Sequence, residues 1–153
     1  MSDPVITDFE LPATSNTVFK LSAQRGRNVV VYFYPKDDTP GCTLEGQEFR
    51  DLYPDFGKAN TTVVGVSRDS LTSHEKFKAK FEFPFELLAD TEEAACQLFG
   101  VMKLKNMYGK QVRGVERSTF VFDADGRLVK SWRGLKAPGH AAEVLAFVQT
   151  LGS

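Results

Sequence analysis

The chain has 153 residues, of which 42% are hydrophobic and 25% are charged, and its 19 basic and 20 acidic side chains give a formal net charge of −1 at pH 7. This length and composition are typical of a soluble globular protein with its own core, so we expect residues 1–153 to form a single domain. A charge this close to zero gives no electrostatic reason to expect nucleic acid or an anionic membrane as a partner.

The cysteines and the first residues exclude further classes. Two cysteines do not make a disulfide framework, and without a Cys-x-x-Cys pair or a Cys/His cluster we expect no metal site. The chain does not open with a basic segment followed by an apolar one, and its longest uninterrupted apolar run is residues 29–34. We therefore expect neither an export signal nor a membrane span, and we place the chain in a reducing compartment, the cytoplasm.

The first third of the chain predicts a hairpin, a buried strand and a helix. Residues 6–11 and 18–21 alternate between apolar and polar side chains, which predicts a small hairpin. The apolar run 29–34 predicts a buried strand that Pro35 ends, and Pro40-Gly41 turns the chain where a helical pattern begins.

Cys42 lies at the start of this predicted helix. It is seven residues before Phe49 on the apolar stripe, so its sulfur faces inward; the stripe continues through Leu52, Tyr53 and Phe56. An inward cysteine is otherwise a small core residue, but Thr39 and the Pro-Gly turn favour a reactive one. Unpaired N–H groups and the helix dipole at an N-terminus favour the thiolate, which is the reactive form of cysteine.

Residues 61–67 predict a second buried strand, and the order strand, helix, strand indicates a parallel βαβ unit. This unit places Cys42 at the carboxyl edge of the sheet, where open α/β sheets bind their ligands. Ser73 is predicted to cap the next helix. His74 stands beside Glu75 and Lys76 near that helix start, and we expect it to be a solvated surface residue rather than a base.

The segment from residue 83 to residue 114 carries the second cysteine. Residues 83–88 predict an extended segment, and Asp90 with Glu93 predicts a capping box for a helix over 91–99. Cys96 shares a face of that helix with Phe99, which favours burial; the alternative is a second redox thiol. Residues 101–114 predict a basic loop, either plain solvated surface or a docking patch for an acidic reductant, with the cations Lys103, Lys105, Lys110 and Arg113.

Two strands and a helix complete the chain. Residues 118–122 and 127–132 flank Asp-Ala-Asp-Gly, a strong hairpin signal, and an amphipathic helix follows along Ala141, Val144, Leu145 and Val148. Arg117 stands at the start of the first strand. An arginine that enters a buried strand normally pairs with a carboxylate, here Glu45 or Glu116. Together the elements predict an α/β fold with helices flanking a mixed central β-sheet.

The motifs resemble one family closely. Pro35, Thr39 and Cys42 match the Pro-x-x-x-Thr-x-x-Cys signature of peroxiredoxins, and the string TPGCTLE resembles the branch called bacterioferritin comigratory protein or peroxiredoxin Q. Arg117, in the string ERSTF, matches the arginine of this family's active site. The resemblance covers nearly the whole chain. It implies a thioredoxin-like fold and a thiol-dependent peroxidase that reduces hydrogen peroxide and organic hydroperoxides without a cofactor.

The resemblance also implies a role for each residue. Cys42 is the nucleophile that reduces the peroxide and becomes a sulfenic acid. Thr39 can orient the peroxide hydroxyl against the sulfur, because its own hydroxyl both donates and accepts hydrogen bonds. Arg117 can hold the thiolate and the developing oxyanion through its fixed fork of donors. Pro35 shields the pocket from water.

The chain departs from many members of this branch at position 47. They carry a second, resolving cysteine there, whereas this chain carries Gln47. The sequence therefore favours a one-cysteine cycle with thioredoxin, glutaredoxin or glutathione as the external reductant. We also expect a monomer. The alternatives are a two-cysteine cycle with Cys96 as resolving cysteine, a peroxide sensor, and a non-catalytic thioredoxin-like binding module.

Overall fold

The computed structural model of the chain describes residue 6 and residues 8–151. The strands are β1 (Glu10–Ala13), β2 (Thr17–Lys20), β3 (Asn28–Phe33), β4 (Thr61–Ser67), β5 (Glu86–Ala89), β6 (Met102–Met107), β7 (Lys110–Val115), β8 (Ser118–Phe122) and β9 (Leu128–Arg133). The helices are the short 3-10 helix η1 (Leu21–Gln24), α1 (Pro40–Lys58), α2 (Leu71–Phe81), α3 (Ala94–Leu98) and α4 (His140–Gln149).

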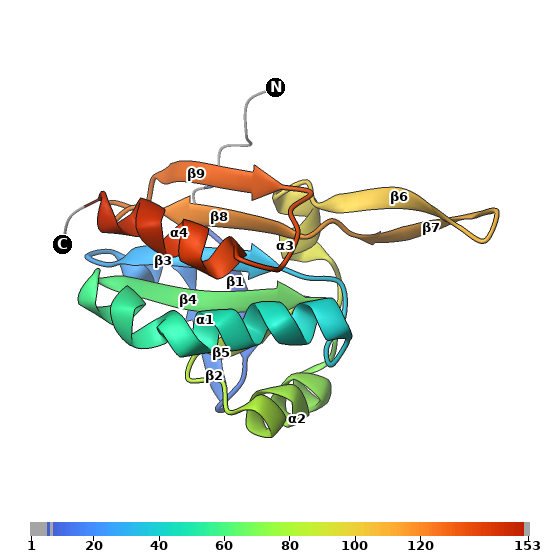
Figure 1. Cartoon of the computed structure of the whole chain (residues 1–153), viewed down its shortest axis with the longest axis horizontal. Helices are drawn as coiled ribbons and strands as arrows, with labels where there is room; N and C mark the ends of the chain where they lie inside the picture. Colours follow the sequence, from blue (N-terminus) through green and yellow to red (C-terminus); the bar gives the residue numbers. More distant parts are fainter. Residues whose placement is uncertain (1–5, 7, 152–153) are drawn as a thin grey trace.

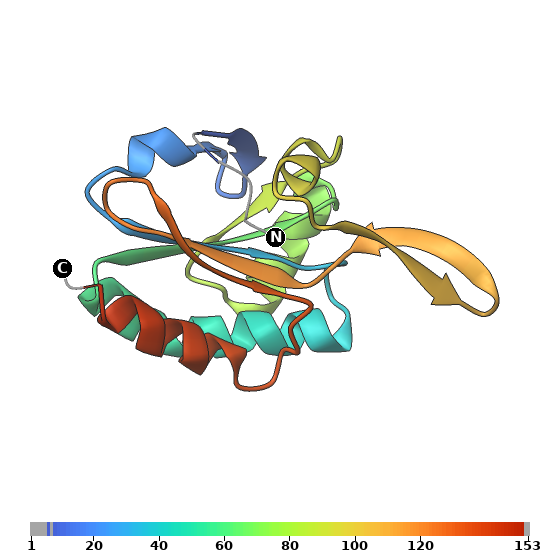
Figure 2. The ribbon, with the colours of Figure 1, turned by 90° about the horizontal axis from the view of Figure 1, so that it is seen from above.

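A seven-stranded mixed sheet forms the centre, in the order β2-β1-β5-β4-β3-β8-β9. The strands β3, β4 and β5 pair in parallel, whereas β8 pairs antiparallel with β3 and β9 antiparallel with β8. Helices α1 and α4 lie side by side on one face, and α3 lies on the other (Figures 1 and 2). The predicted arrangement of a mixed sheet with flanking helices is therefore confirmed, as are the front hairpin, the parallel βαβ unit, the β8–β9 hairpin and the final helix.

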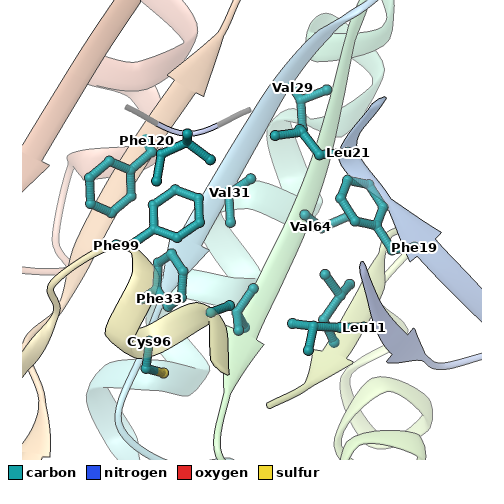
Figure 3. Packing of buried hydrophobic residues seen from close by; sticks show 14 of the residues in the cluster. Leu11, Phe19, Leu21, Val29, Val31, Phe33, Val64, Cys96, Phe99 and Phe120 are labelled. Carbon is teal, nitrogen blue, oxygen red and sulfur yellow. The ribbon is translucent and has the colours of Figure 1, made fainter. Parts of the chain in front are cut away.

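All six residues of β3 are buried, because both faces of this central strand are covered. Side chains alternate between the faces, so Val31 and Phe33 join one core cluster and Val30 and Tyr32 join another. The first cluster includes Cys96 and the ring of Phe99 (Figure 3). The second includes Cys42, together with the predicted stripe residues Phe49 and Phe56 of α1. The sheet thus separates the two cysteines.

The prediction of a basic loop over residues 101–114 is wrong. This segment is the hairpin β6–β7, a separate two-stranded sheet that projects from the body of the molecule (Figures 1 and 2). Tyr108 and Gly109 join its strands with φ values of 53° and 78°. Positive φ at both turn residues is the geometry that suits a two-residue hairpin turn. Most of the described side chains of these strands are exposed, and the cations and glycines of the segment favour a loop over strands in the sequence.

Both predicted helix starts differ from the structure. Ser70, not Ser73, caps α2, and its hydroxyl oxygen accepts a hydrogen bond from the Ser73 N–H at 3.2 Å. The capping box at Asp90 and Glu93 is absent, and α3 is shorter than predicted because Glu93 takes a left-handed conformation with φ of 62°. The Asp90 carboxylate instead accepts hydrogen bonds from the backbone N–H groups of Ala95 and Cys96 at 3.1 and 2.7 Å.

His74 is also placed differently from the prediction. Its ring is fully buried, whereas the sequence predicted a solvated residue. His74 lies three residues before the buried Phe77 and shares its face of α2, so it points toward the sheet. The neighbouring charges Glu75 and Lys76 masked this helical signal. The burial of Cys96, in contrast, is confirmed.

Two glycines of α1 provide a paired test of this packing. A methyl group on Gly46 would overlap the ring of Phe83, whereas one on Gly57 would meet no atom within 4 Å. We expect Gly46→Ala to lower the free energy of unfolding by about 1–3 kcal/mol through overpacking. Gly57→Ala should raise it by up to about 1 kcal/mol, because alanine favours a helix. Urea unfolding of both variants measures the difference, and stabilisation by both substitutions would contradict it.

Candidate active site

The candidate site begins at the N-terminus of α1. Thr39 is the capping residue, with extended backbone angles, and Pro40 is the first helical residue. The first intrahelical bond runs from the Thr43 N–H to the Thr39 carbonyl at 2.8 Å. The N–H groups of Gly41 and Cys42 come before this bond, at the positive end of the helix dipole. This terminus therefore favours a negative charge on the Cys42 sulfur.

Cys42 is 1% exposed and contacts a guanidinium. Nη2 of Arg117 donates to the Cys42 Sγ at 3.4 Å, and Nη1 of the same side chain donates to Glu45 Oε1 at 2.6 Å. Cys42 and Glu45 are three residues apart on α1, so one turn of helix presents both to the same guanidinium. The structure thus brings Arg117 to Cys42 and joins it to Glu45, one of the two carboxylates that the sequence offered.

The sheet brings Arg117 to this position. Ser118 at the start of β8 pairs with Phe33 at the end of β3, so Arg117 lies beside the point where the chain leaves β3 for the candidate site. Its carbonyl accepts the Leu135 N–H at 3.1 Å, which fixes the backbone. A Cβ on Gly41 would lie 3.0 Å from the Arg117 Nη2. The glycine of the predicted Pro-Gly turn therefore leaves the space that the guanidinium occupies.

Glu45 is a fully buried carboxyl. Burial raises its pKa from 4.5 to about 7, against the lowering effect of the Arg117 charge. Its second oxygen, Oε2, has no hydrogen-bond partner among the described residues. Burial alone would lower the pKa of Arg117, but the adjacent Glu45 and Cys42 raise it, so the guanidinium keeps its charge.

The loop between β3 and α1 carries Pro35 and Thr39, both half-buried. The Thr39 hydroxyl donates to the Lys36 carbonyl at 2.9 Å, so it stabilises the loop rather than capping the helix. The oxygen of that hydroxyl keeps its capacity to accept a hydrogen bond. The loop also contains Asp37, which the sequence analysis missed. Its carboxylate lies 2.7 Å from Nδ1 of the buried His74.

Comparison with known proteins identifies the family. Residues 3–131 match the AhpC/TSA family. The chain belongs to this family. It is 52% identical over 139 residues to Peroxiredoxin Bcp of Xanthomonas campestris, covering 91% of this chain and 87% of the relative. It is 47% identical over 138 residues to Peroxiredoxin Bcp of Bacillus subtilis, covering 90% and 88%.

A solved structure agrees with these matches. The structure of the Xanthomonas campestris bacterioferritin comigratory protein, described for its alkyl peroxide reduction activity, aligns with a TM-score of 0.89 and 49% identity, covering 93% of this chain and 90% of that one. The predicted thioredoxin-like fold and the predicted branch of the family are confirmed. The chain is therefore a peroxiredoxin, a thiol-dependent peroxidase. No helix in residues 8–151 is both long and apolar enough to cross a membrane.

The raised pKa of Glu45 predicts a pH-dependent stability. Between pH 4.5 and about 7 the folded chain binds more protons at this carboxyl than the unfolded chain does. The stabilising contribution of this carboxyl group to the free energy of unfolding is therefore fully present below pH 4.5 and is lost as the pH rises through about 7. In Glu45→Gln this loss should disappear, a change of up to about 3 kcal/mol in the free energy of unfolding. Urea unfolding from pH 4 to pH 8 tests this, and parallel curves for parent and variant would contradict it.

Proposed function

We propose that Cys42 is the peroxidatic cysteine of this peroxidase and that an external thiol restores it after each turnover. The contact that carries the assignment is the 3.4 Å hydrogen bond from Arg117 to the Cys42 sulfur, made by a guanidinium that Glu45 holds in place. A thiol at a helix N-terminus and beside a cation is the environment that activates cysteine. Thr39, Arg117 and Pro35 complete the proposed site.

The reaction is a displacement at oxygen. An electron pair of the Cys42 thiolate forms the sulfur–oxygen bond while the O–O bond breaks, and the departing oxygen takes up a proton and leaves as water or an alcohol. Negative charge moves from sulfur to that oxygen. The Arg117 guanidinium, in a buried site, stabilises both charge distributions without having to reorient. Thr39 would align the peroxide by a hydrogen bond, and Pro35 would keep water from the pocket.

The placement of the two cysteines supports the one-cysteine cycle. Cys42 and Cys96 belong to core clusters on opposite faces of the central sheet, and Figure 3 shows the cluster that contains Cys96. Burial and a hydrogen bond to Asp90 raise the pKa of the Cys96 thiol far above its usual range, so it is a poor nucleophile toward a sulfenic acid. A disulfide between them requires Cα atoms within roughly 7 Å of each other. Gln47, where many relatives carry the resolving thiol, lies on α1 and carries none.

The substrates and partners follow from this cycle. We propose hydrogen peroxide and organic hydroperoxides as substrates, as the alkyl peroxide reduction of the Xanthomonas campestris protein supports. Glutathione, glutaredoxin or thioredoxin would serve as reductant to a monomeric, single-domain protein in the cytoplasm. A sensor would use the same residues but would not turn over. A non-catalytic binding module would have no use for the contact between Arg117 and Cys42.

Substitutions at the proposed site should affect the chemical step. We expect Arg117→Met and Thr39→Val to lower the rate constant for peroxide about 10²–10³-fold, as loss of a preorganised donor does. Cys42→Ser should abolish thiol-dependent peroxide reduction and provides the baseline. Stopped-flow kinetics beside thermal unfolding separates activity from stability. If Arg117→Met mainly unfolds the protein, its contact with Glu45 is only a structural ion pair.

The one-cysteine cycle predicts the form of the oxidised protein. One equivalent of peroxide should add a single oxygen to Cys42, trappable by a dimedone reagent, because no thiol is within reach. Cys96→Ser should leave turnover with a thiol donor unchanged. Mass spectrometry of the singly oxidised protein distinguishes the cycles. A loss of two hydrogens with a cross-linked Cys42–Cys96 peptide would establish the two-cysteine cycle instead.

A further inference from the structure

A buried hydrogen-bond cluster holds the middle of the loop between β3 and α1. The Asp37 carboxylate accepts hydrogen bonds from the hydroxyls of Tyr34 at 2.6 Å and Ser73 at 2.8 Å. It also lies 2.7 Å from the His74 Nδ1. The Asp37 backbone N–H donates to Asp69 Oδ2 at 2.9 Å. One residue of the loop is thus tied to the end of β3, to α2 and to the turn after β4.

The partners of His74 determine its protonation. Nε2 lies 2.8 Å from the Leu88 carbonyl oxygen, which can only accept, so Nε2 carries a proton. Nδ1 lies 2.7 Å from Asp37 Oδ2, a contact that also requires a proton between the two atoms. The pair therefore holds one proton more than a neutral imidazole facing a carboxylate. The side chains are 0% and 4% exposed, so water cannot replace this bond.

We propose that His74 is a positioning residue for the peroxidase reaction. Its ring, bonded at both nitrogens and acting through Asp37, holds the loop that carries Pro35 and Thr39 and that leads into Cys42. The contact of Nε2 with the Leu88 carbonyl joins this ring to β5, so the loop is held in a fixed position relative to the sheet. The proposal rests on Cys42 being the reacting cysteine.

The groups around the pair leave the extra proton with His74 and Asp37. Burial raises the pKa of Tyr34 well above 10, so its hydroxyl remains a donor to Asp37. Asp69 is occupied by the Asp37 N–H and the Ser67 hydroxyl. Among the described residues, Lys76 and the exposed ion pair of Lys80 with Asp38 line the pocket beside Asp37. Loss of the proton would set the lone pair of Nδ1 against the Asp37 carboxylate, two acceptors in contact, and would release the loop.

Single-turnover formation of the Cys42 sulfenic acid tests this proposal. His74→Asn should lower the rate constant about 10- to 100-fold, as a small displacement of reacting groups does. An unchanged rate constant in His74→Asn would overturn the proposal.

Asp37→Asn keeps the test valid if His74→Asn does not fold. Its amide nitrogen can donate to a neutral His74 ring and to the Ser73 hydroxyl while its oxygen accepts from Tyr34, so the pair no longer needs the extra proton. The His74 ring should therefore hold one proton fewer in this variant than in the parent, and an equal number in both would contradict the proposal. His140→Asn is the matched control, because this second buried histidine bonds Thr119 and Glu143 and not the loop; it should leave the number of protons on the His74 ring unchanged.

Nitrogen NMR of the histidine ring provides a signature that a merely structural role would not produce. Both ring nitrogens of His74 should carry hydrogen-bonded protons in the parent, because both face acceptors, and only one should do so in Asp37→Asn. A proton on Nε2 alone in the parent would overturn the proposal. Peroxide reduction by Cys42→Ser would instead overturn the assignment of Cys42, so the two failures are distinguishable.

Discussion

A guanidinium shared between a thiol and a carboxylate is the interaction on which the site depends. In water a thiolate needs no partner, but Cys42 is almost fully buried, and a buried anion is costly unless a cation lies beside it. Arg117 supplies that cation, and Glu45 fixes its direction at 2.6 Å. Because the raised pKa of Glu45 shows that burial opposes its ionisation, this carboxylate is held at the expense of stability. The role of Glu45 is therefore to position the Arg117 guanidinium rather than to stabilise the fold.

The sheet makes this arrangement possible through two features of β3. Its parallel pairing with β4 sends the intervening helix back across one face and places Cys42 at the carboxyl edge. Its antiparallel pairing with β8 brings residue 117 to that same edge from a distant part of the sequence. Alternation along β3 then divides the core in two, with Cys42 on one side and Cys96 on the other. One strand therefore brings Arg117 to Cys42, the proposed reacting thiol, and keeps Cys96 on the other side of the sheet.

Much of the fold and the position of Cys42 could be predicted from the sequence, because the patterns that indicate them are local. The apolar run of β3, the Pro-Gly turn and the stripe of α1 each reflect one element, and they were enough to place Cys42. The contact of Arg117 with Cys42 spans 75 residues and came from the resemblance to peroxiredoxins. His74 was misplaced because its partners Asp37 and Leu88 come from other elements. The hairpin β6–β7 was missed because the cations and glycines of residues 101–114 outweighed the short alternation Met-Lys-Leu-Lys at its start.

Access and positioning oppose each other at this site. In the proposed cycle a reductant must reach a Cys42 sulfur that is 1% exposed, so the loop or the first turn of α1 would have to open in the second half of that cycle. In a chain with a resolving cysteine on α1, unwinding of that helix would serve both steps. Here Gln47 offers no thiol, and the buried ties of Asp37 hold the loop closed. The strength of those ties therefore acts in opposite directions on the two halves of the cycle. Tighter ties favour attack on the peroxide, and looser ties favour the return of Cys42 to its reduced form.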